Sequence, residues 1–576
     1  MSRTTRLTSA VLPLFALFVA FVAVRSRRYF ETFSQHPEVT LSQGKIRGIL
    51  LNDGTYPESI EGFMGVPYAL PPVGDLRYRP AVPIPPSEAT IDAFEFGPRC
   101  PGKNIVPLPP GADPQSEDCL TVNIFRPKGW TSEQGRLPVA VLIPGGAFNR
   151  GAARMHNTRS MLAWSTKPFI GVSMQYRIGA MGFLNSRLTE KEDLLNLGLK
   201  DQIVALEWIQ DNIERFGGDP HHVTLIGLSA AAHAIGHHIM NVNQKRTLFH
   251  QAIMDSGAHT ARAVHPASSK LNEVHFNEFL ALSGCDTPVE EDILPCLRST
   301  PSDIITEASF AVFHKSDPSV RWAWQPVQDG NIISRRPIDA WKSGRWNKVP
   351  ILTGFTHNEG SYYAPRSLST SKDFESFFST LLPQLSRGDL VELCELYPDP
   401  AQHRNSLYRD TRIIPAGRQY KRGEAAYGQY AYVCPVRQTA HLATANKTDP
   451  PVFLYHWAVN KTVMLGANHG DQPPYETYNP EVRTISATQE SISGHLHAYM
   501  TSFIVSGNPN KIQGQHFADR PVWDSFAKEQ KTMVFGMGND ERAGGTSKGV
   551  VAQLVKDTWA ERECEFWWRQ TSNYED

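Results

Sequence analysis

Apolar runs that carry no regular polar alternation are the feature that most limits how this chain can fold. The runs that we expect to be strands lie at residues 137–143, 168–174, 223–226, 249–254 and 349–354. Residues 199–216 instead repeat their apolar side chains at helical spacing, and a further helix is expected from residue 230. Strands without alternation are buried on both faces, and helices between them are typical of parallel pairing. The sequence therefore predicts an α/β fold with a mainly parallel central sheet.

One expected strand runs straight into a Gly-x-Ser turn. Gly227, Leu228 and Ser229 are followed by Ala230 and Ala231, and a helix begins at once. A serine at such a turn between strand and helix projects its hydroxyl above the sheet, the geometry of a nucleophile elbow. The full signature closes on glycine, where this chain has alanine. By itself the motif fits either a catalytic nucleophile or a serine at an ordinary strand–helix junction.

Acyl transfer by serine also needs a base held by an acid, and N–H donors for the oxyanion. The segment PGGAF at residues 144–148 follows an expected strand, and its small residues can turn N–H groups toward a substrate oxygen. Glu359 follows another strand, at the sheet edge where active sites form. His469 lies in a glycine-flanked loop farther along the chain. Serine, acid and histidine in that order are typical of α/β-hydrolases.

Longer segments carry a resemblance to a known family. They are FMGVPYALPPVGDLRYRP at residues 63–80, SEDCLTVNIFRP at 116–127, DQIVALEWIQDNIERFGGDP at 201–220, QPVQDG at 325–330 and SGNPN at 506–510. Over about residues 40 to 570 the chain resembles the type-B carboxylesterase/lipase family, which includes the cholinesterases. The resemblance implies an α/β-hydrolase fold, a mainly parallel sheet flanked by helices with elaborating loops. It also implies hydrolysis of a small-molecule carboxylic ester through an acyl-enzyme, with no metal or cofactor needed.

Carried over residue by residue, the resemblance implies Ser229 as nucleophile, Glu359 as acid and His469 as base. The main-chain N–H groups that it implies for the oxyanion hole are those of Gly146, Ala147 and Ala230. The disulfides that it implies are Cys100–Cys119, Cys285–Cys296 and Cys434–Cys564, which leaves Cys394 as a free thiol. From spacing alone, the first two of these pairs could each close a short loop, but a sequence does not fix connectivity.

The chain departs from the family pattern at the elbow and in the oxyanion segment. Leu228 replaces the usual glutamate, which makes the surroundings of the serine more apolar and less suited to cations. Ala231 replaces glycine and adds one methyl, which we expect the neighbouring small residues to absorb at a cost of at most roughly 1–3 kcal/mol. Ala147 replaces the last glycine of His-Gly-Gly-Gly, and we expect its N–H to stay in place provided that its φ stays negative.

The N-terminal segment indicates export. Arg3 and Arg6 precede an apolar run at residues 10–24, and more arginines follow. This pattern fits a signal peptide, or a retained signal anchor that would attach the protein to a membrane through residues 10–24. We therefore divide the chain into a leader at 1–37 and one hydrolase domain at 38–576, secreted or anchored with its catalytic domain outside the cytoplasm. The sequons at Asn446 and Asn460 fit glycosylation in that compartment.

Two other functions fit parts of the sequence. A non-catalytic adhesion or scaffold protein of the same fold would have a broken triad, whereas all three residues are present. A metallohydrolase would need ligands such as His233, His237 and His238, which have zinc-like spacing but lack the accompanying glutamate. The formal charge of −1 gives no electrostatic case for nucleic acid. The oligomeric state is open.

The loop between the first two cysteines narrows the substrate. Residues 101–118 contain no aromatic side chain, so the cation–π platform on which cholinesterases hold a quaternary ammonium is missing. The loop is also short and rich in proline, whereas lipases of this family carry a long lid there. The sequence therefore favours a carboxylesterase of water-soluble esters over an interfacial lipase or a cholinesterase.

Overall fold

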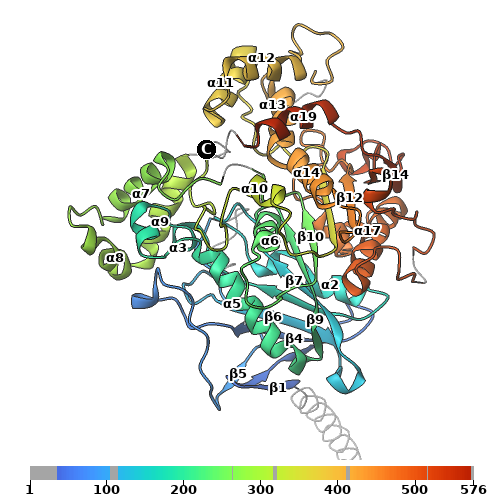
Figure 1. Cartoon of the computed structure of the whole chain (residues 1–576). Coiled ribbons are helices and arrows are strands. Elements are labelled where there is room, and N and C mark those ends of the chain that lie inside the picture. The colour runs from blue at the N-terminus through green and yellow to red at the C-terminus, as the bar shows by residue number, and fades with distance from the viewer. Residues whose placement is uncertain are drawn as a thin grey trace, which may run out of the picture.

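The central sheet of the computed structural model has eleven strands. They are β3 (Ile49–Leu51), β4 (Ile60–Pro67), β6 (Thr121–Pro127), β7 (Leu137–Ile143), β8 (Ile170–Met174), β9 (Gly218–Leu228), β10 (Gln251–Asp255), β11 (Ile351–Thr356), β12 (Val452–Trp457), β13 (Lys531–Phe535) and β14 (Ala552–Lys556). Their order is β14-β13-β12-β11-β10-β9-β7-β8-β6-β4-β3 (Figure 1). From β8 through β7 to β13 every neighbouring pair is parallel, whereas the strands at both edges pair antiparallel. The predicted α/β class and mainly parallel sheet are confirmed.

The structure describes residues 36–572, apart from 104–113, 262–263, 316–320, 410–414 and 515–516. The apolar run at residues 10–24 and most of the loop at 101–118 therefore lie outside the described residues. Within the described part of the chain, no helix combines the length and apolarity needed to span a membrane. A separate three-stranded sheet is formed by β1 (Glu38–Leu41), β2 (Gly44–Arg47) and β5 (Thr90–Asp92).

Both faces of the central sheet are buried, as the lack of alternation predicts. In β7, Val139, Val141 and Ile143 face one core while Ala140 and Leu142 face the other. The first core is covered by α5 (Leu197–Asn212), α6 (Ala230–Met240) and α14 (Cys434–Ala443), and the second by α2 (Thr158–Ala163) and α17 (Ala487–Ser506). Each fully buried aliphatic side chain contributes roughly 1.5–3 kcal/mol, so this central strand is held from both sides.

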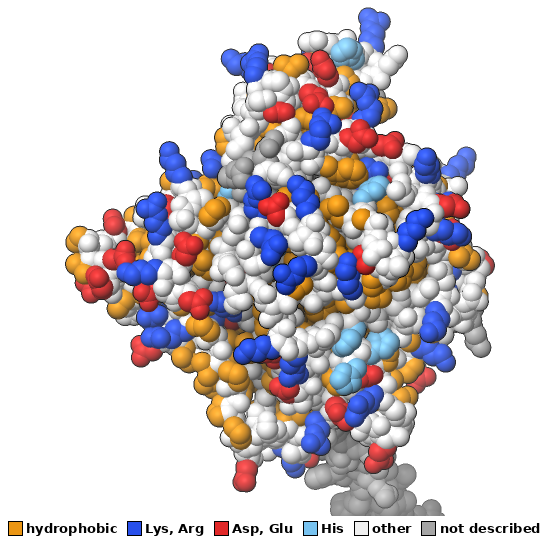
Figure 2. Space-filling view, in the orientation of Figure 1, with side chains coloured by type: hydrophobic (Ala, Val, Ile, Leu, Met, Phe, Trp, Pro, Cys, Tyr) orange, Lys and Arg blue, Asp and Glu red, His pale blue; other side chains and the backbone are white. Residues whose placement is uncertain are grey.

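Two groups of helices project from this framework (Figure 1). One group is α7 (Lys270–Ser283), α8 (Glu290–Ser299) and α9 (Ser302–Lys315), and the other is α11 (Ser371–Leu381), α12 (Arg387–Leu396) and α13 (Tyr420–Gly428). The remaining helices are α3 (Gly179–Gly182), α4 (Arg187–Lys191), α10 (Pro337–Lys342), α15 (Pro473–Glu476), α16 (Pro480–Arg483), α18 (Phe526–Glu529) and α19 (Glu561–Gln570). Acidic and basic side chains are interspersed over the face shown in Figure 2.

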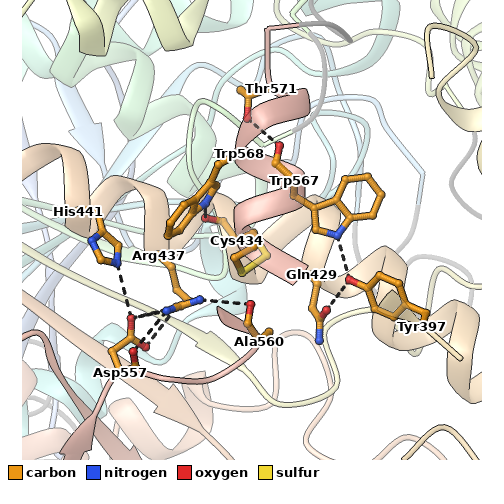
Figure 3. The surroundings of a disulfide bond; sticks show 11 residues. Tyr397, Gln429, Cys434, Arg437, His441, Asp557, Ala560, Trp567, Trp568 and Thr571 are labelled. Atoms are coloured by element: carbon orange, nitrogen blue, oxygen red, sulfur yellow. Dashed lines mark hydrogen bonds and ion pairs between the residues drawn. A yellow bond between two sulfur atoms is a disulfide. The ribbon is translucent and has the colours of Figure 1, made fainter. Parts of the chain in front are cut away.

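The three implied disulfides are all formed, and Cys394 is free and half-buried. Cys434–Cys564 joins α14 to α19, beside a buried ion pair in which Arg437 Nε lies 2.9 Å from Asp557 Oδ2 (Figure 3). The Cys434 carbonyl also accepts a hydrogen bond of 2.8 Å from the Trp568 indole. The C-terminal helix is thus fixed to the long helical segment that runs from α13 into α14.

The two sequons differ in their surroundings. Asn446 is exposed, whereas Asn460 is half-buried and donates its side-chain amide to Asp540. A glycan on Asn460 would replace that hydrogen bond, so Asn446 is the more accessible acceptor of the two.

Candidate active site

The segments singled out from the sequence follow four strands that lie near one another in the sheet. The segment 144–148 follows β7, Ser229 follows β9, Glu359 follows β11 and His469 comes after β12. These strands are parallel, so their carboxyl ends lie at the same edge of the sheet, where loops of α/β proteins form binding sites.

Ser229 has the backbone conformation of an elbow. Its φ of 62° and ψ of −123° lie outside the regions that L-residues normally occupy. Its N–H donates a 2.8 Å hydrogen bond to the Asp255 carbonyl, and its own carbonyl accepts the N–H of His233 in the first turn of α6. Strain of this kind costs on the order of 1–3 kcal/mol and persists only where the surroundings enforce it. The turn between β9 and α6 is therefore strained, unlike an ordinary strand–helix junction.

The alanine that replaces the last glycine of the elbow fits because a glycine faces it. A Cβ built on Gly227 would lie 2.7 Å from the Ala231 Cβ and 2.9 Å from its backbone carbon. Ala231 itself is fully buried in the first turn of α6 and is not among the residues with positive φ. The expectation that small neighbours absorb the extra methyl agrees with this packing.

The oxyanion segment corrects one expectation. Ala147 has a φ of 55°, not a negative value, and it stands between Gly146 at 121° and Phe148 at 58°. Its carbonyl accepts hydrogen bonds from Asn149 Nδ2 at 2.8 Å and Gln325 Nε2 at 3.0 Å. These amide donors hold the turn in the left-handed region against the steric cost of the methyl, which a negative φ would have avoided.

The main-chain donors implied for the oxyanion hole are available. Among the described residues, the N–H groups of Gly146, Ala147 and Ala230 donate no hydrogen bond to a protein acceptor. Gly145 brings this segment against the elbow, since a Cβ there would lie 2.2 Å from the Leu228 carbonyl oxygen and 3.6 Å from the Ser229 Cβ.

His469 and Glu359 form a buried pair. His469 Nδ1 lies 2.5 Å from Glu359 Oε2, and the other carboxylate oxygen accepts the Thr356 N–H at 2.7 Å. Their side chains are 8% and 0% exposed. His469 Nε2 is buried and has no hydrogen-bond partner within the described part of the chain. The bond to Glu359 places the imidazole proton on Nδ1 and leaves a lone pair on Nε2, as a general base requires.

Several groups around this pair were not found from the sequence. The Asn358 N–H donates to the Ala467 carbonyl at 2.8 Å, which joins the loop of the acid to the loop of the base. The Tyr432 ring lies 4.4 Å from the His469 ring. Tyr432 belongs to a π-helical turn, η5 (Gln429–Val433), and such turns occur often at functional sites. Asn358 adjoins Glu359 and could have been suspected, but Tyr432 gives no sequence signal.

A second carboxyl group lies behind the elbow. Asp255 Oδ1 accepts the Tyr455 hydroxyl at 2.7 Å, and Gln472 Nε2 lies 3.3 Å from both the Tyr455 hydroxyl and Ser256 Oγ. Burial raises the pKa of Asp255 to about 7, and burial beside Asp255 raises the pKa of Glu476 as well. The elbow therefore rests on a carboxyl that is about half protonated at pH 7.

The histidines that could have suggested a metal site are core residues. His233 Nδ1 lies 2.7 Å from the Ala258 carbonyl, and His238 Nε2 lies 2.8 Å from Gln202 Oε1. Burial lowers the pKa of His238 to about 4 and lowers the pKa of His237 well below its ordinary value. No group of three or more potential metal ligands occurs among the described residues.

Comparisons with known proteins show the family to which the chain belongs. The model of the Carboxylesterase family matches residues 35–567. Secreted lipase 4 of Gibberella zeae is 32% identical, over 89% of this chain and 88% of the lipase. An inactive carboxylesterase-like protein of Byssochlamys spectabilis is 31% identical, over 79% of this chain and 82% of its own. The crystal structure of Aspergillus niger EstA superposes with a TM-score of 0.78 at 28% identity, covering 94% of this chain and 99% of EstA. The chain thus has an α/β-hydrolase fold, belongs to the carboxylesterase family and is a carboxylic ester hydrolase.

Proposed function

We propose that Ser229, Glu359 and His469 are the triad that hydrolyses the ester. The observation that carries this proposal is the His469 imidazole, which is bonded to Glu359 through Nδ1 and has a buried Nε2 that bonds to no group in the described part of the chain. A base with this orientation can take the proton of a serine hydroxyl, and the Glu359 carboxylate then stabilises the imidazolium.

In the proposed reaction, Ser229 Oγ attacks the ester carbonyl while His469 Nε2 accepts the hydroxyl proton. The oxyanion that forms is held by the N–H groups of Gly146, Ala147 and Ala230, which cost no reorganisation because the backbone already fixes them. The imidazolium protonates the leaving alcohol. Water then attacks the acyl-enzyme with His469 as base, which releases the acid and restores the serine.

The substrate class that we propose is esters dissolved in water, rather than emulsified lipid or choline esters. Two features support this: the loop at 101–118 has no aromatic residue, and Leu228 removes a carboxylate from beside the nucleophile. The Leu228 side chain packs on the loop of the base, where a Cβ on Gly470 would lie 3.4 Å from Leu228 Cδ2. Hydrolysis rates measured across the solubility limit of a short-chain ester would test this, because an interfacial lipase accelerates sharply above that limit.

A second candidate is a family member that has kept the fold and lost activity, as the printed name of the Byssochlamys spectabilis relative describes. The positive φ of Ala147 is the observation that favours it, because a methyl in a strained turn could displace an oxyanion donor. The complete Glu359–His469 pair argues for activity.

A fluorophosphonate probe distinguishes these candidates, because it labels only an activated serine. We expect peptide mapping to find the label on Ser229 in the wild type and nowhere in Ser229→Ala, which should also lose ester turnover while remaining folded. Absence of labelling on folded wild-type protein would favour the inactive candidate.

We further propose that the protein enters the secretory pathway. The secreted lipase relative and the three disulfides support this, because disulfides persist in oxidising compartments. Whether residues 10–24 are removed or anchor the protein to a membrane is decided by N-terminal sequencing of material from culture medium and from washed membranes. Glycosidase treatment of the same material, with an Asn446→Gln variant, tests the glycan.

A further inference from the structure

A pocket of about 70 Å³ opens between residues of the two projecting groups of helices. Its walls come from the start of α7, the end of α11, the turn from α13 into η5, and residues 321–327. Trp322, Tyr427 and Tyr430 supply aromatic surface. Aromatic walls with a few polar groups are typical of sites that bind part of a small molecule.

The pocket adjoins the proposed catalytic groups in two ways. Gln325 lines it and donates the 3.0 Å hydrogen bond to the Ala147 carbonyl in the oxyanion segment. Trp322 also lines it, and its ring lies 5.6 Å from the Tyr363 ring, which in turn lies 5.4 Å from the His469 ring. Ser229, Glu359 and His469 do not line the pocket themselves; it is separated from the oxyanion segment by Gln325 and from His469 by the Tyr363 ring.

The lining of the pocket carries a net positive charge. Among the described lining residues Arg321 carries the single full charge, and none is acidic. Arg321 forms no ion pair with any carboxylate in the described part of the chain. Burial lowers the pKa of the neighbouring His265, and the Arg321 guanidinium lowers it further, so this imidazole is neutral near pH 7.

Both carboxylates of the adjoining helix α7 are already engaged. Glu273 Oε1 accepts the Arg187 N–H at 2.8 Å, and Glu278 Oε1 lies 2.6 Å from Nζ of Lys315 on α9. The pocket therefore combines aromatic walls with one guanidinium to which no described acid is bonded.

We propose that this pocket selects esters that carry a carboxylate on an aromatic or aliphatic skeleton, and that Arg321 is the specificity-determining residue. Arg321 is exposed at the pocket wall, so its guanidinium can reach a carboxylate there and bind it through two parallel hydrogen bonds. The inference rests on the proposed function, since it assigns a substrate class to the same site.

The test compares matched charged and neutral esters. Mono-4-nitrophenyl glutarate against 4-nitrophenyl butyrate places the carboxylate on the acyl side, and 4-acetoxybenzoate against phenyl acetate places it on the alcohol side. We expect wild type to have the higher kcat/KM for the charged member of at least one pair. In Arg321→Gln the charged-to-neutral ratio for that pair should fall by about 2- to 5-fold, the scale of an exposed ion pair. Arg321→Lys should keep part of the ratio, and the exposed control Arg562→Gln should keep all of it.

A binding measurement separates failure of this inference from failure of the proposed function. In Ser229→Ala, tryptophan fluorescence titrated with benzoate and with benzyl alcohol reads the pocket without turnover, because Trp322 lines it. We expect tighter binding of benzoate, and loss of that difference in Ser229→Ala/Arg321→Gln. An unchanged ratio in Arg321→Gln, an equal loss on charged and neutral esters, or equal binding of the two ligands would overturn the inference. Absence of any turnover or fluorophosphonate labelling, with benzoate preferred, would overturn the triad but keep the anion-binding pocket.

Discussion

The elbow after β9 and the oxyanion segment after β7 carry the same departure from their family, an alanine in place of a glycine, with different physical consequences. In the elbow, Ala231 lies in the first turn of α6 and its methyl occupies the space left by the missing Cβ of Gly227. In the oxyanion segment, Ala147 keeps a φ of 55°, and two side-chain amides hold its carbonyl. The Ala231 methyl is accommodated by packing, whereas the Ala147 methyl causes backbone strain.

The difference shows that the backbone conformation decides what an extra methyl costs. A methyl at negative φ costs only the space that it fills, and small neighbours can provide that space. A methyl in the left-handed region costs roughly 1–2 kcal/mol wherever it points. The two regions can therefore be perturbed separately, by substitutions within either one or at their contact.

Gly145→Ala should have the largest effect, because Gly145 is where the two regions touch. Its Cβ would lie 2.2 Å from the Leu228 carbonyl oxygen, which belongs to the backbone and cannot rotate away. We expect the oxyanion donors to move away from Ser229, with a loss in kcat of at least the roughly 100- to 1,000-fold that one donor is worth. Initial rates on a soluble ester measure this. Gly388→Ala is the matched control, since its Cβ would meet only Ser386 Oγ at 3.6 Å, and an equal loss there would contradict the explanation.

Asn149→Ala should loosen the oxyanion segment alone. Asn149 Nδ2 donates to the carbonyls of Ala147 and Ala323, and the side chain is buried. Without it, the strained turn can relax toward negative φ, and we expect kcat to fall about 10- to 100-fold, less than full loss of a donor. Asn149→Asp keeps the volume and removes the N–H donor, so it should lose at least as much. Activity retained in Asn149→Asp would show that volume, not the amide donor, holds the turn.

The fold was largely predictable because strand burial is a local property of the sequence. The expected strand at 137–143 coincides with β7, whereas the one at 223–226 is extended to Gly218–Leu228. That extension arises from pairing of Gly218 with Leu137 on β7, which no pattern within the segment encodes. Ser229, Glu359 and His469 were chosen from chain order and resemblance, and the hydrogen bond between the last two agrees with that choice.

The parts that were missed depend on contacts between distant segments. The sign of φ at Ala147 is set by Asn149 and by Gln325, which lies 178 residues away in the chain. Tyr432 meets His469 because η5 passes the loop of the base, and no spacing predicts that contact. The position of Arg321 on the pocket wall likewise follows from helices that the sequence alone does not bring together.

Glycine substitutions should separate packing from strain. Ala231→Gly removes a buried methyl worth about 0.8 kcal/mol and adds a helical glycine, so we expect the free energy of unfolding to fall by about 1–2 kcal/mol. Ala147→Gly loses a similar methyl but relieves the left-handed strain, so its stability should stay within about 1 kcal/mol of wild type. Urea denaturation of both variants measures the difference. Equal destabilisation would mean that strain at Ala147 is negligible and would remove the distinction between the two regions.

The smallest expected effect is a change in local stability with pH. It should occur in the elbow but not in the oxyanion segment. The Asp255 carbonyl holds the Ser229 N–H, and burial raises the pKa of its carboxyl to about 7. A raised folded-state pKa makes the native state bind the proton more tightly than the unfolded state, so the stabilisation is complete below about pH 4 and is lost as pH rises through 7. Going from pH 7 to pH 8 covers only the end of that titration and should cost a few tenths of a kcal/mol.

Hydrogen exchange, corrected for its intrinsic pH dependence, should therefore accelerate slightly in peptides covering residues 224–235. It should not accelerate in peptides covering residues 144–150, because the Asn149 and Gln325 side chains that hold this segment do not titrate. Asp255→Asn keeps an acceptor for Tyr455 and should abolish the change; acceleration that persists in this variant would place the titrating group elsewhere.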